Sequence, residues 1–358
     1  MRVLVVGPIF PDSFARNILV TLQAMRHDAF SIPGVWAVHH GNRWVNALRR
    51  SLPGIFPILD RRHFDLIIRA ARRLNPDLVL VTYGITPPEV VQRLKESCSA
   101  RVVCWFTDAI PNLHRDYLIG SAFDAIFVKE PALVRLLREK IGLPAYYLPE
   151  CCNPIWHRTV ALTQEDRRRY GCDIAAAGTL HYYRARMLEA LDGYDLKIWG
   201  RNAPPWVATS VKNRYRNCYV AEESKAKAFR AAKIVVNTIH YTEIEGVNCT
   251  CFEAAACGAF QIADWRPALA ELFEVDREIV TYRSRGDLKE RVDYYLAHPA
   301  ERQQIAARAE ARAHREHTYA HRLNKMFEIM GLPAGDPLLS GYNPNRVNWL
   351  QVSGKSIR

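Results

Sequence analysis

Short apolar runs recur along the chain, and several of them end at a glycine or a polar residue. The first run, Val-Leu-Val-Val, occupies residues 3–6 and is followed directly by Gly7. Continuous apolar runs of this length are typical of strands in a parallel sheet, whose two faces are both buried. The same pattern predicts strands at residues 2–7, 78–83, 101–106, 123–128, 146–148, 173–177, 196–199, 233–237, 259–263 and 279–282.

Between these runs, apolar residues recur three or four positions apart, which is the spacing of one face of an amphipathic helix. This spacing predicts helices at residues 14–25, 64–74, 87–95, 132–140, 184–191, 225–232, 287–297, 300–315 and 319–330. The alternation of strands and helices predicts an α/β fold with doubly wound, Rossmann-like parallel sheets. Residues 36–52 show no clean period and are expected to form a surface loop and a short helix.

Pro149 and Pro154 interrupt the alternation and mark the expected hinge, because proline stops both helices and strands. A chain of 358 residues is too long for one ordinary core and suits two domains. We expect an N-terminal Rossmann-like domain, a second such domain, a terminal helix that could pack back on the first domain, and a tail, at residues 1–152, 153–318, 319–330 and 331–358. The default ligand site is then the cleft between the facing edges of the two sheets.

The composition is that of a globular protein, with 49% hydrophobic and 24% charged residues. No apolar run approaches the roughly 18 residues needed to span a bilayer. Residues 1–7 lack the apolar length and cleavage site of a signal peptide, so we expect a cytoplasmic protein. The nine cysteines form no Cys-x-x-Cys pair and are odd in number, which favours free thiols over disulfides or a zinc site.

The formal net charge of +12 fits three kinds of partner: an anionic small ligand, an anionic membrane surface or nucleic acid. The lysines and arginines are spread along the chain, and the densest cluster is at residues 167–169. A dispersed distribution is also typical of solvated helix faces. The charge therefore leaves a binding role open beside an enzymatic one.

The stretch at residues 245–264 combines a glycine-containing loop, a short helix, a glycine stop and a strand. Asn248 or Thr250 is expected to cap the start of the helix, and Gly258 is expected to end it. Helical spacing predicts a buried stripe on this helix, made of Cys251, Phe252 and Ala255.

Two carboxylates flank the start of this helix, because Glu245 lies in the loop before it and Glu253 lies inside it. The first N–H groups of a helix have no intrahelical partner, and the helix dipole is positive at this end. Such a helix start suits a phosphate or diphosphate, and the carboxylates can accept hydrogen bonds from sugar hydroxyls. The stretch therefore predicts a nucleotide-sugar site, against the plainer alternative of two solvated glutamates.

These residues resemble those of GT-B glycosyltransferases, and more narrowly those of the spore-maturation CgeB-like group, which is related to the family 4 retaining enzymes. The motif is Glu-x7-Glu followed by Ala-Ala-Ala-Cys-Gly. The similar segments are residues 105–108, 148–154, 245–258 and 294–322. The likeness is good over residues 173–325 and weaker over 1–155, and residues 331–358 lie outside it.

The resemblance implies that the second domain holds a nucleotide-sugar donor. By their places in the family motif, Glu245 would contact the transferred sugar and Glu253 the ribose. Arg184, or Arg186 as second choice, would neutralise the diphosphate, because a fixed guanidinium can bind developing phosphate charge bidentately. The plainer alternative for both arginines is a solvated helix face. The other donor-site candidates are Gly7, Gly178, His240, Gly246, Val247, Asn248, Cys249 and Thr250.

The chain departs from the family 4 pattern at two places. No lysine follows between Gly178 and Arg186, where the family usually carries an arginine and a lysine, and Asn248 stands where a second glycine often lies. The resemblance implies transfer with retention, for which no protein nucleophile and no metal are required. The departing phosphate oxygen can take the acceptor proton, and the arginine and helix dipole replace a metal. Arg184 and Glu245 are then the catalytic candidates.

An inverting enzyme would instead need a general base in the first domain. Asp108 at the end of a strand is the candidate, with His114 second, and each has a structural alternative. The donor would be UDP-, GDP- or dTDP-linked, with no further cofactor required.

The acceptor could be a small molecule, a glycan, a lipid-linked molecule, a protein or nucleic acid, and peripheral contact with an anionic membrane stays open. One alternative is a degenerate GT-B binding protein whose basic surface holds nucleic acid or an anionic membrane. An epimerase or phosphorylase on the same fold is a further alternative.

Overall fold

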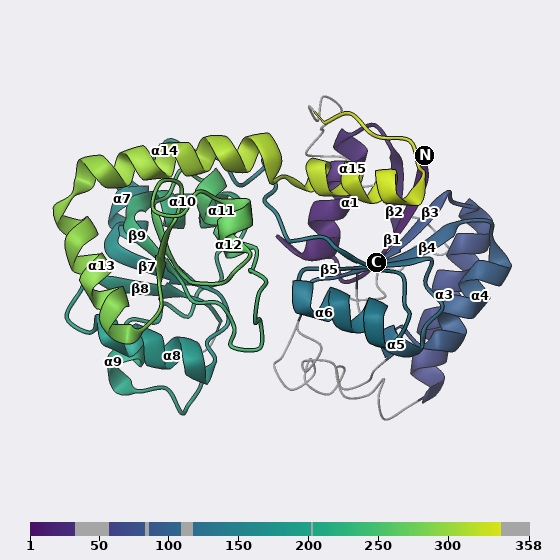
Figure 1. Cartoon of the computed structure of the whole chain (residues 1–358), viewed down its shortest axis with the longest axis horizontal. Helices are drawn as coiled ribbons and strands as arrows, with labels where there is room; N and C mark the ends of the chain where they lie inside the picture. The colour runs from purple at the N-terminus through teal and green to yellow at the C-terminus, as the bar shows by residue number, and fades with distance from the viewer. Residues whose placement is uncertain (33–56, 83–85, 109–116, 202, 338–358) are drawn as a thin grey trace. The chain divides into compact units, whose positions relative to one another are not determined.

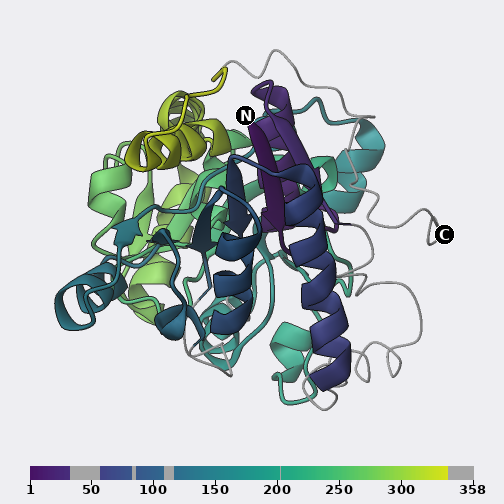
Figure 2. The same ribbon diagram turned by 90° about the vertical axis from the view of Figure 1, so that its right-hand side faces the viewer.

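The computed structural model describes residues 1–32, 57–82, 86–108, 117–201 and 203–337 of the chain. The chain divides into two compact units. The first is Met1–Leu148 together with the segment that starts at Tyr319, and the second is Pro149–Thr318. Each unit is built around one parallel sheet with helices on both faces (Figures 1 and 2). The predicted alternation of strands and helices is confirmed.

The sheet of the first unit has six parallel strands in the order β2-β1-β3-β4-β5-β6. The strands are β1 Arg2–Val6, β2 Asp28–Ser31, β3 Leu78–Val81, β4 Arg101–Phe106, β5 Ala125–Val128 and β6 Ala145–Tyr147. The strand order reverses between β1 and β3. Ligands of open α/β sheets bind beside such a reversal, outside the carboxyl ends of the strands.

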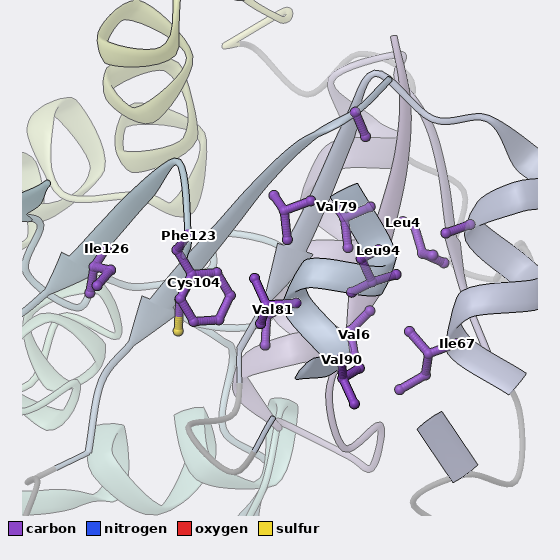
Figure 3. Packing of buried hydrophobic residues seen from close by; sticks show 14 of the residues in the cluster. Leu4, Val6, Ile67, Val79, Val81, Val90, Leu94, Cys104, Phe123 and Ile126 are labelled. Carbon is purple, nitrogen blue, oxygen red and sulfur yellow. The ribbon is translucent and has the colours of Figure 1, made fainter. Parts of the chain in front are cut away.

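One face of this sheet is covered by two helices that follow the strands closely in sequence. Val6 of β1 and Val81 of β3 pack with Ile67 and with Val90 and Leu94 in one buried cluster (Figure 3). The helices of the first unit are α1 Phe14–Ala24, α3 Pro57–Leu74, α4 Pro88–Ser97, α5 Tyr117–Gly120, α6 Pro131–Arg135 and α15 Tyr319–Met330. Ile67 lies on α3, and Val90 and Leu94 lie on α4.

The other face of the sheet is covered by α1 and by α15, which comes from the far end of the sequence. The ring of Phe14 on α1 lies 4.7 Å from that of Trp105 on β4 and 5.8 Å from that of Tyr319 on α15. Trp105 points to this face because successive residues of a strand alternate between faces. The last described helix therefore completes the core of the first unit.

The sheet of the second unit has five parallel strands in the order β11-β10-β9-β7-β8. The strands are β7 Cys172–Ala177, β8 Leu196–Trp199, β9 Ala232–Asn237, β10 Gln261–Asp264 and β11 Val280–Tyr282. The helices are α7 Gln164–Tyr170, α8 Tyr182–Leu188, α9 Thr209–Lys212, α10 Glu223–Ala231, α11 Thr250–Ala256, α12 Leu269–Leu272, α13 Arg285–Ala297 and α14 Pro299–Glu316. The strand order reverses between β7 and β9, so their carboxyl ends form the expected ligand edge of this unit.

Several features were not expected from the sequence. The strand β2 was not predicted, because it is a four-residue edge strand without an apolar run. The helix α7 was not predicted, because only its Tyr170 is buried and the segment has no helical period. The helix expected at 132–140 changes after α6 into a π-helical turn at Leu136–Lys140. A 3-10 turn at Glu189–Leu191 likewise extends α8.

Residues 36–52 lie outside the described residues. None of the described helices combines the length and the apolar character needed to cross a membrane.

Candidate functional site

The helix of the central stretch is α11, and Gly258 ends it as predicted. Gly258 has φ +65°, and its N–H donates to the carbonyl of Ala255 at 2.9 Å. The loop, helix, glycine stop and strand predicted for this stretch are therefore confirmed. Cys251, Phe252 and Ala255 are buried as predicted, and burial extends to every residue from Cys251 to Ala256. The cause is tertiary: α11 packs against β9, β10, α10 and α14.

Neither of the side chains expected to cap α11 does so. The N-cap residue is Cys249, and its side chain makes no capping hydrogen bond. The amide of Asn248 is instead paired with the amide of Asn237 at the end of β9. Each Nδ2 donates to the Oδ1 of the other residue, at 2.9 and 3.0 Å. The amide pair thus joins the loop before α11 to the sheet.

Replacing Asn248 by alanine is expected to lower the free energy of unfolding by about 1–3 kcal/mol, because the amide oxygen of Asn237 loses its donor. Asn237 is 1% exposed, so water cannot readily replace that donor. Urea unfolding followed by circular dichroism measures the change. Asn213→Ala, at an exposed position, is the matched control and should shift stability by less than ~0.5 kcal/mol. Equal losses in the two variants would contradict the role of the amide pair.

The loop before α11 is also held by the segment that follows β10. The N–H of Ala268 donates to the carbonyl of Glu245 at 3.0 Å, and Arg266 Nε donates to the carbonyl of Glu243 at 2.6 Å. Arg266 Nη1 lies 3.0 Å from Oδ1 of Asp264, and both side chains are largely buried. Burial raises the pKa of Asp264. The backbone around Glu245 is therefore positioned by groups outside the Glu-x7-Glu motif.

Three backbone N–H groups at this helix start are not used within the described residues, and two of them belong to the partly exposed residues Asn248 and Thr250. The N–H groups of Val247, Asn248 and Thr250 make no hydrogen bond within the part of the chain that the structure describes. They lie at the start of α11, where the helix dipole is positive. Backbone N–H groups in this arrangement suit the oxygens of a phosphate or diphosphate.

Arg184 on α8 bridges the two strands between which the strand order reverses. Its Nη1 donates to the carbonyls of Ala177 at 3.3 Å and Thr179 at 2.8 Å, and its Nη2 donates to the carbonyl of Thr238 at 2.8 Å. Ala177 ends β7, and Thr238 follows β9. A guanidinium has five N–H donors, so these three bonds leave two for a ligand.

The charge of Arg184 lies beside the loop before α11. Burial lowers the pKa of the guanidinium, whereas Tyr282, Glu243 and Cys249 nearby raise it. Arg184 Nη2 bonds the carbonyl of Thr238, and the preceding residue, Asn237, pairs with Asn248 in the loop before α11, so the guanidinium is linked to the helix start through the end of β9. A fixed cation and backbone donors at one sheet edge can bind an anion without a metal.

Two candidates from the same segment have different surroundings. Gly178 follows β7 with φ +112°, and a Cβ at this position would come within 2.8 Å of Arg184 Nη1. The glycine therefore permits both the turn and the placement of the guanidinium. Arg186 is 67% exposed and pairs with Glu189 at 2.8 Å. The structure does not bring Arg186 to the group formed by Arg184 and the helix start.

Glu253 is 5% exposed and takes part in a buried ion pair that the sequence did not predict. Its Oε2 accepts a hydrogen bond from Lys225 Nζ at 3.0 Å, and its Oε1 lies 3.7 Å from Nε2 of the fully buried His157. Lys225 lies on α10. No sequence pattern links it to Glu253, because packing between the two helices alone brings them together.

His240, which was expected beside the ligand, lies next to a second histidine. Its ring centroid is 4.5 Å from that of His181, and its Nδ1 is 2.6 Å from Oγ1 of Thr242. His181 is the N-cap of α8 and accepts a hydrogen bond from the N–H of Arg184. Burial, with the charges of Arg184 and His240, lowers the pKa of His181 to about 4. His181 is therefore a neutral neighbour of the guanidinium at neutral pH.

The remaining candidates belong to the first unit. Gly7 follows β1, and a Cβ at this position would lie 1.9 Å from Oγ1 of Thr82, so packing against the end of β3 already requires the glycine. Asp108 is exposed, two residues after β4. His114 lies outside the described residues.

Residues 184–328 of the chain match a protein family described as glycosyl transferase-like. Spore protein CgeB of Bacillus subtilis (strain 168) is 22% identical over 283 residues, which cover 74% of this chain and 86% of CgeB.

Two solved structures are similar over almost the whole chain. Sucrose-phosphate synthase from Thermosynechococcus elongatus superposes with a TM-score of 0.65 and 12% identity, covering 92% of this chain and 98% of that one. Anabaena HepE, solved in complex with UDP and glucose, superposes with a TM-score of 0.65 and 13% identity, covering 92% of this chain and 99% of HepE. The predicted resemblance to GT-B glycosyltransferases and the CgeB-like group is confirmed, and the chain has the GT-B fold of two parallel-sheet α/β units.

Proposed function

We propose that this protein is a glycosyltransferase that binds a nucleotide-sugar donor at the carboxyl ends of β7 and β9 in the second unit. The observation that carries the proposal is that Arg184 bonds the backbone at the end of β9, where Asn237 also holds the loop before α11. The diphosphate of the donor would accept hydrogen bonds from the two remaining donors of Arg184 and from the N–H groups of Asn248 and Thr250. Arg184 thus takes the role that the resemblance assigns to it.

The donor is proposed to be a uridine diphosphate sugar, with GDP- and dTDP-linked sugars as alternatives. This choice is supported by the HepE structures, which contain UDP, or UDP-glucose. Glu245 would accept hydrogen bonds from hydroxyls of the transferred sugar. Glu253, oriented by Lys225, would accept them from the ribose.

The proposed reaction breaks the bond between the anomeric carbon and the diphosphate and forms one to an acceptor hydroxyl on the same face. The leaving diphosphate gains negative charge, and Arg184 with the dipole of α11 stabilises it. The departing phosphate oxygen takes the proton of the acceptor hydroxyl, so no protein nucleophile and no metal are required. If the reaction inverts, Asp108 is the proposed general base.

A binding screen tests the proposal. UDP, GDP, dTDP and their common sugar conjugates are added at increasing concentration to the full chain in the presence of EDTA, and the unfolding temperature is followed. A ligand at 100 times its dissociation constant adds about 2.7 kcal/mol to the free energy of unfolding. Stabilisation by one nucleoside diphosphate would support the donor site.

Stabilisation by nucleic acid or anionic lipid vesicles, with no response to any nucleotide, would overturn the transferase proposal. A binding protein of that kind would also show an affinity that falls steeply with salt concentration. The two proposals therefore differ in ligand and in salt dependence. Steady release of nucleoside diphosphate from one nucleotide sugar would separate an enzyme from a degenerate donor-binding protein.

Replacing Glu245 by glutamine is expected to lower kcat/KM for donor cleavage by about 10- to 150-fold, because hydrogen bonds to a charged group are worth about 1.5–3 kcal/mol. The affinity for the nucleoside diphosphate alone should stay within about twofold, since that ligand lacks the sugar. Glu271→Gln, at an exposed position on α12, is the matched control. Equal weakening of the nucleotide and the nucleotide sugar would show that Glu245 does not contact the sugar.

A further inference from the structure

His157 is a fully buried histidine near the start of the second unit, and its two ring nitrogens face different groups. Its Nδ1 accepts a hydrogen bond from the N–H of Asn153 at 3.0 Å. Its Nε2 lies 3.7 Å from Oε1 of Glu253, the second glutamate of the motif. The imidazole therefore stands between the segment that opens the unit and the helix α11.

The hydrogen bond at Nδ1 determines which ring nitrogen carries the proton. A backbone N–H can only donate, so Nδ1 of His157 must accept, and the proton of the neutral ring is on Nε2. A protonated ring would instead place a second N–H against the N–H of Asn153. The nitrogen that faces the carboxylate of Glu253 is consequently a donor.

The turn that carries the imidazole is held by hydrogen bonds of its own. The N–H of His157 donates to the carbonyl of Asn153 at 2.7 Å, and the N–H of Ile155 donates to Oδ1 of Asn153 at 3.1 Å. The preceding residue, Cys152, donates its N–H to the carbonyl of His317, directly after α14, at 3.0 Å. Because α14 also packs against α11, the imidazole and the helix that it faces are held by shared packing.

The carboxylate of Glu253 can accept hydrogen bonds from the protein and from a ligand at the same time. An ionised carboxylate has two oxygens with about four lone-pair sites. Lys225 Nζ donates to Oε2 at 3.0 Å, and Nε2 of His157 faces Oε1. With one protein donor on each oxygen, about two sites remain, which is the number that the two hydroxyls of a ribose need.

We propose that His157 is a positioning residue, which holds Glu253 by the oxygen that Lys225 does not bind and so fixes the carboxylate for the ribose of the donor. The inference rests on the proposed function, since it needs Glu253 to contact the ribose. The distance of 3.7 Å is longer than a hydrogen bond, and contacts of this kind in ligand sites often tighten only when the ligand is bound. The imidazole touches no reacting atom, so its contribution is to donor affinity.

Isothermal titration of the full chain with UDP, its 2′,3′-dideoxy form and inorganic pyrophosphate tests the proposal; another nucleoside diphosphate replaces UDP if the binding screen selects it. His157→Asn keeps an acceptor at about the place of Nδ1 and removes the donor at Nε2. It is expected to weaken UDP by about 3- to 10-fold, the effect of one hydrogen bond. Its affinity for the dideoxy form and for pyrophosphate should stay within about twofold, because neither ligand has ribose hydroxyls.

Two further measurements separate positioning from a purely structural role. His157→Gln places an amide donor at about the position of Nε2 and should retain more of the affinity for UDP than His157→Asn does. In His157→Asn, KM for the nucleotide sugar should rise by about the same factor as the dissociation constant for UDP, while kcat stays within about twofold. Melting curves show that each variant is folded, and the ratio of the affinities for UDP and its dideoxy form does not depend on the folded fraction.

His298→Asn, at an exposed position between α13 and α14, is the matched control and should leave all affinities unchanged. Equal loss of UDP and its dideoxy form in His157→Asn, or no loss of either, would overturn the positioning role. The proposed function would stand in both cases, provided that the wild-type chain binds UDP more tightly than the dideoxy form. A wild-type chain that binds the two equally would remove the ribose contact and with it this inference, and one that binds neither would overturn the proposed donor site as well.

Discussion

Replacing Arg184 by methionine is expected to lower kcat for donor cleavage by about 10²–10³-fold, the effect of removing one fixed donor from developing negative charge. The guanidinium bonds the carbonyl of Thr238 at the carboxyl end of β9 and is the proposed partner of the leaving diphosphate. The measurement is the rate of nucleoside diphosphate release from the nucleotide sugar that the binding screen selects. Affinity for the free nucleoside diphosphate should fall as well, because that ligand carries the same charge.

The same substitution removes the donors of three backbone carbonyls, at Ala177, Thr179 and Thr238. A loss of stability of about 1–3 kcal/mol is expected if one buried carbonyl stays unpaired, so activity must be normalised to folded protein. Arg184→Lys keeps the charge, but one ammonium cannot reproduce a planar fork of donors and should restore activity only in part.

Arg186→Met is the matched control for this experiment, because Arg186 is on the same helix, is 67% exposed and pairs only with Glu189 among the ion pairs found in the described residues. It should leave both kcat and nucleotide affinity unchanged. Similar losses in Arg184→Met and Arg186→Met would show that activity depends on the net positive charge of the protein and not on the position of the Arg184 guanidinium. The diphosphate site proposed at Arg184 would then be abandoned.

Replacing Glu253 by alanine is expected to lower the free energy of unfolding by about 3–5 kcal/mol, because it removes one member of a largely buried ion pair. The side chains of Lys225 and Glu253 are only 11% and 7% exposed, and they are 3.0 Å apart. Urea unfolding measures the loss. Glu223→Ala, also on α10, breaks a more exposed pair with Lys227 and should cost less than about 1 kcal/mol.

A double-mutant cycle separates the ion pair from simple packing loss. Lys225→Met combined with Glu253→Gln should cost less than the sum of the two single changes, because the double variant buries neither charge of the pair. Strict additivity would show that the pair does not couple the two helices. Because Glu253→Ala also destabilises the protein, a loss of ligand binding in this variant does not by itself show contact with the ribose. Ligand binding by Glu253→Gln is the comparison that tests this contact.

Lys225 changes the interpretation of the second glutamate in the motif. The resemblance implies that Glu253 contacts the ribose, and the structure adds a cation that holds its carboxylate. We infer that Lys225 is a positioning residue, which orients Glu253 from α10. The expectation is that Lys225→Met raises KM for the donor more than it lowers kcat, since the lysine does not touch the reacting atoms.

The amino-acid sequence by itself determined the elements and the class of fold. The strand Arg101–Phe106 is an uninterrupted apolar run after one arginine, and its bounds are those predicted. Gly258 was identified as the end of α11 because glycine is the residue that takes the left-handed conformation without strain. These features depend on neighbours in the sequence, so one sequence is enough to predict them.

Only the tertiary structure decided how the chemical groups of the site are held. Asn248 pairs with Asn237, Arg184 with Thr238 and Glu253 with Lys225, across 11, 54 and 28 positions of sequence. α11 is buried on all sides because α14, which begins more than forty positions later, packs against it. Such contacts depend on how strands are ordered and helices packed, and hydrophobic periodicity carries no information about which distant polar groups will meet.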